Sequence, residues 1–379
     1  MISRASLMIA CLLALSASPV MSASGASPEA LHIIKELGLR TASAPIPRAE
    51  GWRPAKVLVT APPFLQAIVP DYADQLLQAA GNVELVIDDS GSLVPDAKLL
   101  EGVDALIGLC RPASVAAATE LVWLHSYFVG MDDCASLTSE QVTNRTFTNG
   151  KRLSGPAIAE HSIAMIMSLA RGLPAYQRAQ NAAVWDNGLR QQIKFGELKG
   201  KTLLVVGLGG IGTQVAWRAH GLGMKVIATR HSSRTGPDYV SYVGLSDELL
   251  KLAAQADVVV NALPLTAKTQ GLFDETFFAA VKHGALFVSV GRGKSTVTAA
   301  LLAALESGQL YGAGLDVTDP EPLPADSPLW QMDNVIITPH SSAAGSDSLQ
   351  RSAVIAVENL RRYVAGEPML NVVDMAAGY

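Results

Sequence analysis

The stretch KTLLVVGLGGIG, residues Lys201–Gly212, decides the fold of this chain. Thr202–Val206 is a short run of branched apolar residues, which is typical of a strand buried on both faces of a parallel sheet. Apolar residues at helical spacing follow from Ile211, so the glycines lie at a turn from strand to helix. A helix N-terminus at this turn offers free N–H groups and a partial positive charge to phosphates.

The glycines of this turn have the spacing G-x-G-x-x-G. We expect Gly207 to permit the tight turn, Gly209 to let a pyrophosphate approach the backbone, and Gly212 to let the helix pack closely on the strand. The alternative is a glycine-rich turn that binds nothing. The predicted dinucleotide contacts in this turn are Gly207, Leu208, Gly209, Gly210, Ile211 and Gly212.

The composition bounds the class of protein. A length of 379 residues predicts two domains, and 49% hydrophobic against 17% charged residues allows a large core. A net charge of −5 without a Lys/Arg-rich run argues against a nucleic-acid surface. The three cysteines, Cys11, Cys110 and Cys134, lack metal-binding spacing, so we expect no metal site.

The N-terminus has the layout of a secretory signal peptide. Arg4 is the only charge before Glu29, Leu7–Ala17 is apolar, and small residues follow to Ala26. We therefore expect removal of residues 1–25 and export, to the periplasm, of a mature chain without a membrane span. Cys110 and Cys134 would then meet oxidising conditions, in which a bridge can form. The alternative is an uncleaved extension on a cytoplasmic enzyme.

Strand-like and helix-like segments alternate along the rest of the chain. The predicted fold class is α/β, with two Rossmann-like domains built on doubly wound parallel sheets. We expect an N-terminal extension and linker at 26–54, with a helix over 29–37 capped by Ser27, and a substrate domain at 55–153 plus 343–379. The dinucleotide-binding domain, at 154–342, is inserted into it. The predicted strands cover 56–60, 83–87, 104–109, 123–129 and 146–148, then 202–206, 225–229, 257–263, 285–290, 313–317 and 335–338.

Three longer helices are predicted around these strands, over 65–80, 157–173 and 348–365. The second is expected to bridge the two domains, and the third to pack back on the first domain. His161, near the start of the second, is interpreted as a structural histidine bonded to backbone.

The residues after the second strand of the inserted domain bear on the choice of cofactor. NAD-specific sites place an Asp or Glu about 20 residues after the first glycine, where it bonds the ribose 2′-OH. This chain has Arg230, followed by Ser232 and Arg234. Guanidinium and hydroxyl groups suit a 2′-phosphate, so NADP is the preferred prediction and NAD its alternative. A solvated loop with incidental arginines is the other interpretation.

Functional residue types follow the remaining strands. Arg292 follows the fourth strand between two glycines, Asp316 and Glu321 follow the fifth, and His340 follows the sixth. Because ligands bind beyond the carboxyl ends of such strands, these side chains are expected on one rim of the sheet as a catalytic constellation. Further cofactor contacts are expected there, at Leu263, Pro264, Thr269, Val290 and Gly291.

From about Leu106 to Leu370 the chain resembles the D-isomer-specific 2-hydroxyacid dehydrogenase family. The matching stretches, in order, are WLHSYFVGMD at 123–132, 159–161, 207–212, 263–272, 289–293, 315–322 and 337–340. By this resemblance Arg292, Glu321 and His340 match the catalytic triad, and Asp316 matches a contact on the nicotinamide side. The resemblance also implies that backbone N–H groups at Val129 and Gly130 bind the substrate carboxylate, and that the chain is a homodimer. Arg230 and the signal-like N-terminus depart from the family pattern.

The predicted reaction, similar to that of glyoxylate/hydroxypyruvate reductases, is hydride transfer from NAD(P)H to a small 2-keto acid, giving a D-2-hydroxy acid. His340 would donate the proton, Glu321 would hold the imidazole, and Arg292 would bind the carboxylate and polarise the carbonyl. Arg111 and Arg152 are further candidates for an anionic substrate. A non-catalytic nucleotide sensor of the same fold is the alternative. Glu321 argues against a formate-dehydrogenase-like activity, in which glutamine takes that place, and no G-x-S-x-G motif of a serine hydrolase occurs.

Overall fold

The computed structural model describes residues 25–61, 63–88, 90–92, 94–134, 136–231 and 233–377. Two parallel sheets, one of five strands and one of seven, organise them, which confirms the predicted α/β fold with two Rossmann-like domains. The predicted signal peptide lies outside the described residues except for Gly25, and Ser232 also lies outside them. Within the described ranges, no helix combines the length and the apolar character that crossing a membrane requires.

The first domain is built on the five-stranded sheet, in the order β2-β1-β3-β4-β5. Its strands are β1 Lys56–Thr60, β2 Glu84–Asp88, β3 Ala105–Gly108, β4 Trp123–Ser126 and β5 Thr146–Asn149. Its shorter helices are α2 Pro63–Ile68, α3 Tyr72–Ala80, α4 Pro112–Ala117 and α5 Ser139–Val142. The single helix predicted over 65–80 is wrong: α2 and α3 are separate because Pro70 lacks an N–H and cannot continue a helix.

The second domain is built on the seven-stranded sheet, in the order β12-β11-β10-β9-β6-β7-β8. Its strands are β6 Thr202–Val206, β7 Lys225–Thr229, β8 Tyr242–Gly244, β9 Val258–Asn261, β10 Ala285–Ser289, β11 Leu310–Leu315 and β12 Val335–Ile337. Its helices include α8 Gly210–Gly221, α9 Leu249–Ala253, α10 Glu275–Ala280 and α11 Thr298–Glu306. The order reverses between β6 and β9, which is the switch point where such sheets bind ligands.

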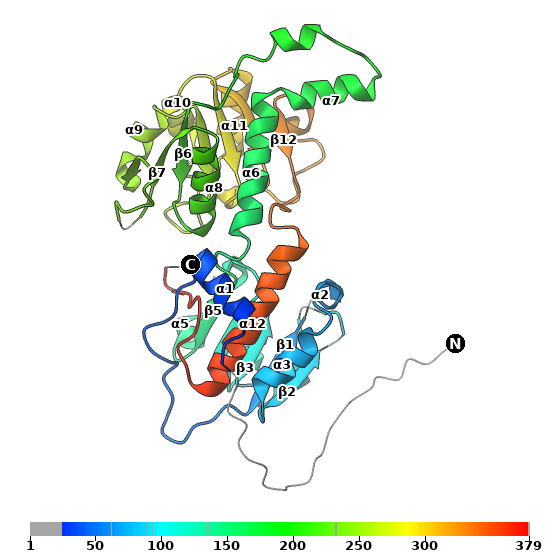
Figure 1. The fold of residues 1–379 in the computed structure, drawn as a ribbon, viewed down its shortest axis with the longest axis vertical. Helices are drawn as coiled ribbons and strands as arrows, with labels where there is room; N and C mark the ends of the chain where they lie inside the picture. Colours follow the sequence, from blue (N-terminus) through cyan, green and yellow to red (C-terminus); the bar gives the residue numbers. More distant parts are fainter. Residues whose placement is uncertain are drawn as a thin grey trace, which may run out of the picture.

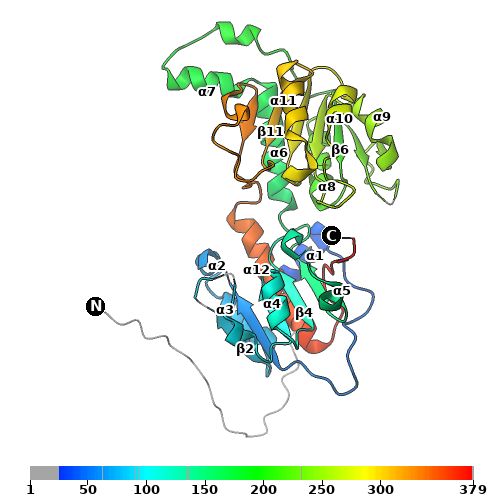
Figure 2. The same ribbon diagram turned by 180° about the vertical axis from the view of Figure 1, so that it is seen from behind.

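Two long helices stand where the chain passes between the domains, α6 Gly155–Ala170 and α12 Ser346–Ala365. α6 packs against α8 and the second sheet, and α12 packs against α2 and α3 on the first domain, as predicted. The helix predicted over 157–173 ends early, because Gly172 takes a left-handed conformation (φ +64°) and a new helix, α7 Leu173–Asn181, begins. In both views, α7 and the loop after it project from the second domain (Figures 1 and 2).

The N-terminal extension begins with helix α1, Pro28–Leu37, as its sequence predicts. The Ser27 hydroxyl accepts a hydrogen bond from the Ala30 N–H at 3.1 Å and caps the helix. The buried face of α1 belongs to a cluster that includes Val354 and Ile355 of α12. Both views place α1 beside α12, at the end of the first domain that faces α8 (Figures 1 and 2).

The segment after α1, predicted as a linker, is packed against the first domain. The Arg48 guanidinium lies 4.6 Å from the centre of the Trp52 ring and 4.9 Å from that of Tyr363, a residue of α12. Ile46 is buried in the core of the same domain. The predicted linker therefore packs on the first domain, because its aromatic and cationic side chains have partners on α12.

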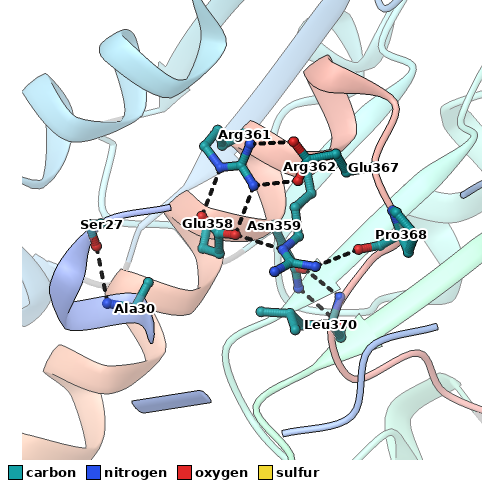
Figure 3. A network of polar contacts seen from close by, with 9 residues as sticks. All are labelled: Ser27, Ala30, Glu358, Asn359, Arg361, Arg362, Glu367, Pro368 and Leu370. Carbon is teal, nitrogen blue, oxygen red and sulfur yellow. Dashed lines mark hydrogen bonds and ion pairs between the residues drawn. The ribbon is translucent and has the colours of Figure 1, made fainter. Parts of the chain in front are cut away.

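A polar network ties the chain after α12 to that helix (Figure 3). The buried Glu358 carboxylate accepts hydrogen bonds from Arg361, at 2.9 and 3.0 Å, and from Arg362, at 2.6 Å. The Asn359 amide accepts from the Leu370 N–H at 2.8 Å and donates to the Leu370 carbonyl at 3.2 Å. Leu370 also pairs with Thr41, so the segments that follow α1 and α12 lie side by side on the first domain.

Candidate active site

The glycine turn after β6 has the shape that a dinucleotide phosphate requires. Gly207 takes φ +99°, and Gly212 lies so close to the strand that a Cβ there would be 2.2 Å from the Gly207 carbonyl oxygen. Gly209 is the N-cap of α8, and a Cβ built on it would meet nothing within 4 Å. The start of the helix is thus open at Gly209, where its free N–H groups can donate to an anion.

Arg230 and Arg234, which the sequence predicts beside a 2′-phosphate, are held differently. Arg230 follows β7 and donates from its Nε to the Leu208 carbonyl at 3.0 Å, so its guanidinium lies against the glycine turn. Arg234 instead forms an ion pair with Glu248 and donates to the Tyr242 hydroxyl at 3.0 Å. Arg230 is therefore better placed for a cofactor than Arg234.

The ends of β9 and β10 are tied together by a buried side chain that sequence reasoning missed. The Asn261 amide donates to the hydroxyls of Ser289 and Ser295, at 3.0 and 2.8 Å, and accepts from the Leu263 N–H at 3.1 Å. These bonds shape the loops that carry the predicted cofactor contacts. Within those loops the Thr269 hydroxyl donates to the Pro264 carbonyl at 2.7 Å, and the Val290 N–H donates to the Asn261 carbonyl at 3.0 Å.

Arg292 projects from the second domain onto the first. Its Nε donates to Asp132 Oδ2 at 2.8 Å, across the space between the domains, and its Nη1 donates to the Gly291 carbonyl at 2.8 Å. A Cβ on Gly130 would lie only 2.0 Å from Nη2, so the guanidinium needs a glycine there. Gly293 is needed as well, because a Cβ on it would be 1.7 Å from the Thr318 carbonyl oxygen.

The backbone at Val129 and Gly130 faces the same guanidinium. The Val129 carbonyl accepts a hydrogen bond from the Asn149 side chain at 2.7 Å, which fixes the peptide plane. Neither the Val129 N–H nor the Gly130 N–H donates to an acceptor within the part of the chain that the structure describes. Two N–H groups and a guanidinium at one place suit a carboxylate.

His340 and Glu321 form a direct pair. Nδ1 of His340 lies 3.0 Å from Glu321 Oε2, and the other oxygen of Glu321 accepts from the Thr318 N–H at 2.9 Å. Both side chains are exposed to solvent. The pair has the geometry in which a carboxylate orients an imidazole for proton transfer.

Asp316 supports the backbone on which His340 lies. Its carboxylate, almost fully buried, accepts from the Thr338 hydroxyl at 2.6 Å and from the N–H groups of Ser341 and Ser342, at 2.9 and 3.1 Å. Its carbonyl accepts from the His340 N–H at 2.8 Å. His340 has φ +52°, which is uncommon without glycine, so these bonds hold a conformation of low intrinsic stability. The nicotinamide contact of Asp316 stays a prediction.

His161, interpreted from the sequence as a structural histidine bonded to backbone, bonds to a side chain instead. Its Nε2 lies 2.9 Å from the Thr338 hydroxyl and 3.9 Å from an Asp316 carboxylate oxygen. The expectation is wrong because α6 places its first turns against the loop after β12, which periodicity does not reveal. His161 thus extends the polar group under His340.

The loop that carries Gly130 and Asp132 is cross-linked to the end of β3. Cys134 forms a disulfide with Cys110, with the two Cα atoms 5.8 Å apart. The neighbours Arg111 and Asp133 form an ion pair beside it, so Arg111 does not face the substrate as a free cation. Among the residues that the structure describes, no three potential metal ligands gather.

The chain is similar to known proteins over most of its length. The family model for the D-isomer specific 2-hydroxyacid dehydrogenase, NAD binding domain, matches residues 163–342. The chain is 32% identical over 279 residues to a glyoxylate reductase of Korarchaeum cryptofilum, covering 72% of this chain and 82% of that protein.

Solved structures are also similar to this chain over most of its length. A D-isomer specific 2-hydroxyacid dehydrogenase from Xanthobacter autotrophicus Py2, solved with NADPH and MES, has a TM-score of 0.71 at 29% identity, over 86% of this chain and 100% of that one. An NADPH-dependent glyoxylate/hydroxypyruvate reductase from Sinorhizobium meliloti, solved with NADP and sulfate, has a TM-score of 0.70 at 27% identity, with the same coverage. The chain therefore belongs to the D-isomer-specific 2-hydroxyacid dehydrogenase family, as an NAD(P)-dependent enzyme.

Proposed function

We propose that this enzyme reduces a small 2-keto acid to the D-2-hydroxy acid, with NADPH preferred over NADH. The observation that carries the proposal is the His340–Glu321 pair at 3.0 Å, on the same sheet rim as Arg292. The relatives that are reductases of glyoxylate or hydroxypyruvate support a substrate of that size.

The cofactor and the side chains of the site each have a separate role in the reduction of the keto acid. The nicotinamide cofactor, held by residues 207–212 and the loops after β9 and β10, supplies the hydride when it is bound. Arg292 and the N–H groups of Val129 and Gly130 bind the keto-acid carboxylate, and the guanidinium polarises the carbonyl. His340 donates a proton from Nε2 to the oxygen that becomes the hydroxyl. Glu321 accepts the Nδ1–H, which keeps Nε2 directed at the substrate.

Steady-state kinetics with both cofactors on glyoxylate, hydroxypyruvate, pyruvate and phenylpyruvate test the reaction. His340→Ala and Arg292→Ala are expected to lower kcat/KM for the best acid by similar large factors, because both groups act in one transition state. Glu321→Gln is expected to cost less. Near-normal turnover by His340→Ala contradicts the assignment. Tight NADPH binding without turnover of any acid favours the nucleotide sensor instead.

Arg230 supports the preference for NADPH. In the described part of the chain only its Nε is engaged, so its two Nη groups can bind a 2′-phosphate beside the glycine turn. A charged hydrogen bond contributes about 1.5–3 kcal/mol, and exposure favours the lower value, so we expect about a tenfold preference in kcat/KM. Arg230→Asp is expected to reduce or invert the ratio. An unchanged ratio means that Arg230 faces solvent.

The remaining proposals concern the whole chain. We propose domain boundaries at 153/154 and 342/343, a homodimer, and a signal peptide at residues 1–25 that sends the mature chain to the periplasm. The Cys110–Cys134 disulfide supports an oxidising compartment. N-terminal sequencing of the protein from its own host tests export, and an intact Met1 in the cytoplasmic fraction contradicts it.

A further inference from the structure

Arg152 lies between the two domains and touches the N-terminal extension and the glycine turn. Its Nη1 donates to the Leu37 carbonyl, at the end of α1, at 3.0 Å. Its Cγ occupies the space beside Gly210, where an added Cβ would be 2.8 Å away. Arg152 also has φ +75°, a conformation that residues other than glycine seldom adopt, so its surroundings hold it in place.

The charges around Arg152 have one sign. Burial lowers the pKa of the Arg152 guanidinium, and the positive charges of Arg40 and Arg230 lower it further. Burial likewise lowers the pKa of Lys151, followed by the charges of Arg40 and Arg152. Positive groups from the extension, from the loop after β5 and from the end of β7 therefore lie close enough to repel one another, and Arg152 and Arg230 among them touch the glycine turn. Such a group of like charges is stabilised when an anion binds among them.

The contacts indicate which part of a dinucleotide each arginine faces. Arg152 packs on Gly210, the first residue of α8, where the helix N-terminus attracts the pyrophosphate. Arg230 lies at the end of β7 and touches Leu208, on the side where the adenosine ribose is expected. The stem of Arg152 thus lies beside the start of α8 while its guanidinium bonds to the Leu37 carbonyl, and the Arg230 guanidinium lies at the opposite, ribose side of the same turn.

We propose that Arg152 binds the pyrophosphate of the cofactor from the first domain, with its guanidinium oriented by the Leu37 carbonyl of the N-terminal extension. This inference rests on the proposed function. Arg152 then acts on NADPH and NADH alike, because both carry the pyrophosphate, whereas Arg230 discriminates between them. Binding of the dinucleotide also joins the extension, the first domain and the second domain through one side chain.

Equilibrium binding of NADPH and of NADH to the full chain, followed by fluorescence without any keto acid, tests this role. Arg152→Met is expected to raise both dissociation constants by the same factor, about tenfold, since a bond between an arginine and a phosphate is lost. The ratio of the NADPH dissociation constant to the NADH dissociation constant is expected to stay at the wild-type value. Arg152→Lys, which keeps the charge without the forked geometry, is expected to lie in between.

Arg48→Met is the matched control. Arg48 is also a partly buried arginine that donates to a backbone carbonyl, that of Tyr363, but it stacks on aromatic rings away from the glycine turn. Arg48→Met removes the same charge as Arg152→Met and is expected to leave the dissociation constants of NADPH and NADH unchanged. Raising the salt concentration is expected to weaken binding less in Arg152→Met than in the wild type.

The outcomes separate this inference from the proposed function. If a folded Arg152→Met variant has wild-type dissociation constants, the inference about Arg152 is wrong and the proposed function is unaffected. If only the NADPH constant changes, Arg152 contacts the 2′-phosphate and the pyrophosphate assignment is wrong. If Arg152→Met does not fold, an Arg152→Lys variant with wild-type affinity and salt dependence overturns it. A wild-type chain that binds neither nucleotide refutes the proposed function itself.

Discussion

The structure gives Asp132 a role that the sequence did not predict, which is to position the side chain of Arg292. It holds Arg292 through Nε, which leaves the Nη2 group facing Gly130 and the proposed carboxylate site. Asp132→Asn keeps the shape but removes the negative charge that orients the guanidinium. We expect kcat/KM for the keto acid to fall about tenfold, chiefly through a higher KM, because a charged hydrogen bond is weakened.

Asp133→Asn is the control for this change, because Asp133 is the adjacent acid and pairs with Arg111 instead. It is expected to leave KM within about twofold of the wild type, since pairs this exposed contribute little. Equal effects of the two substitutions would show that general charge, and not the contact with Arg292, is responsible.

His125 in β4 makes stability depend on pH. It is fully buried beside Thr148, and burial lowers its pKa to about 3. The unfolded chain takes up a proton on this ring near pH 6.5, whereas the folded chain does not. The free energy of unfolding contributed by His125 is therefore complete above pH 6.5 and falls by about 1.4 kcal/mol per pH unit below it.

Urea unfolding at several pH values between 7.5 and 5 measures this slope. His125→Gln is expected to flatten it, even if the variant is less stable at every pH. The exposed His283, substituted in the same way, is expected to leave the slope unchanged. A slope that His125→Gln does not alter would mean that other groups set the acid sensitivity.

Among the elements, the loop from Val129 to Cys134 depends on its cross-link to β3. The Cys110–Cys134 disulfide closes a segment of 24 residues, and constraining a loop of that length stabilises the folded chain by about 3 kcal/mol. Reduction is expected to lower the melting temperature and to raise KM, because Gly130 and Asp132 lie on this loop. The double variant Cys110→Ser/Cys134→Ser should not respond to reductant, and an unchanged melting temperature on reduction of the wild type would disprove the constraint.

Elements with a strong local signal were predictable, and those set by tertiary contacts were not. The run at Thr202–Val206 followed by glycines defines strand β6 and helix α8 by residue type alone. β8 has three residues and too short a pattern to detect, and α7 begins only because Gly172 breaks the preceding helix.

The same distinction holds for the candidate site. Arg292 and His340 could be named because each follows a strand on the rim where ligands bind. The partners of Asp132 and Asn261, the pairing of Arg234 with Glu248, and the contact of His161 with Thr338 depend on segments distant in sequence. No periodicity encodes such contacts, so the fold was easier to predict than the orientation of its side chains.

For the whole molecule, the exposed apolar residues of the second domain support the proposed dimer. Trp217 on α8 is 56% exposed, Met167 on α6 is 43% exposed, and both line a hollow of about 500 Å³ between these helices. Trp185, beyond α7, is 92% exposed. A hollow lined by exposed apolar groups of this size is typical of a surface that binds a partner.

Light scattering after size-exclusion chromatography is expected to give the mass of two chains. Trp217→Glu should shift the enzyme toward the monomer, because it places a charge in this apolar hollow. Trp330→Glu changes an exposed tryptophan near β12 and serves as the control. A wild-type monomer at micromolar concentration contradicts the dimer.

The two passages of the chain between the domains, at the start of α6 and before α12, have a consequence for the order of binding. Because these two segments connect the domains, we expect one domain to rotate relative to the other about the line that joins the two connections. Arg152 stands three residues before α6, near that axis, so we expect it to keep its contact with Gly210 when the domains open, whereas Arg292 would separate from Asp132. We therefore expect the dinucleotide to bind first, and the keto acid to find its complete site only after the domains close.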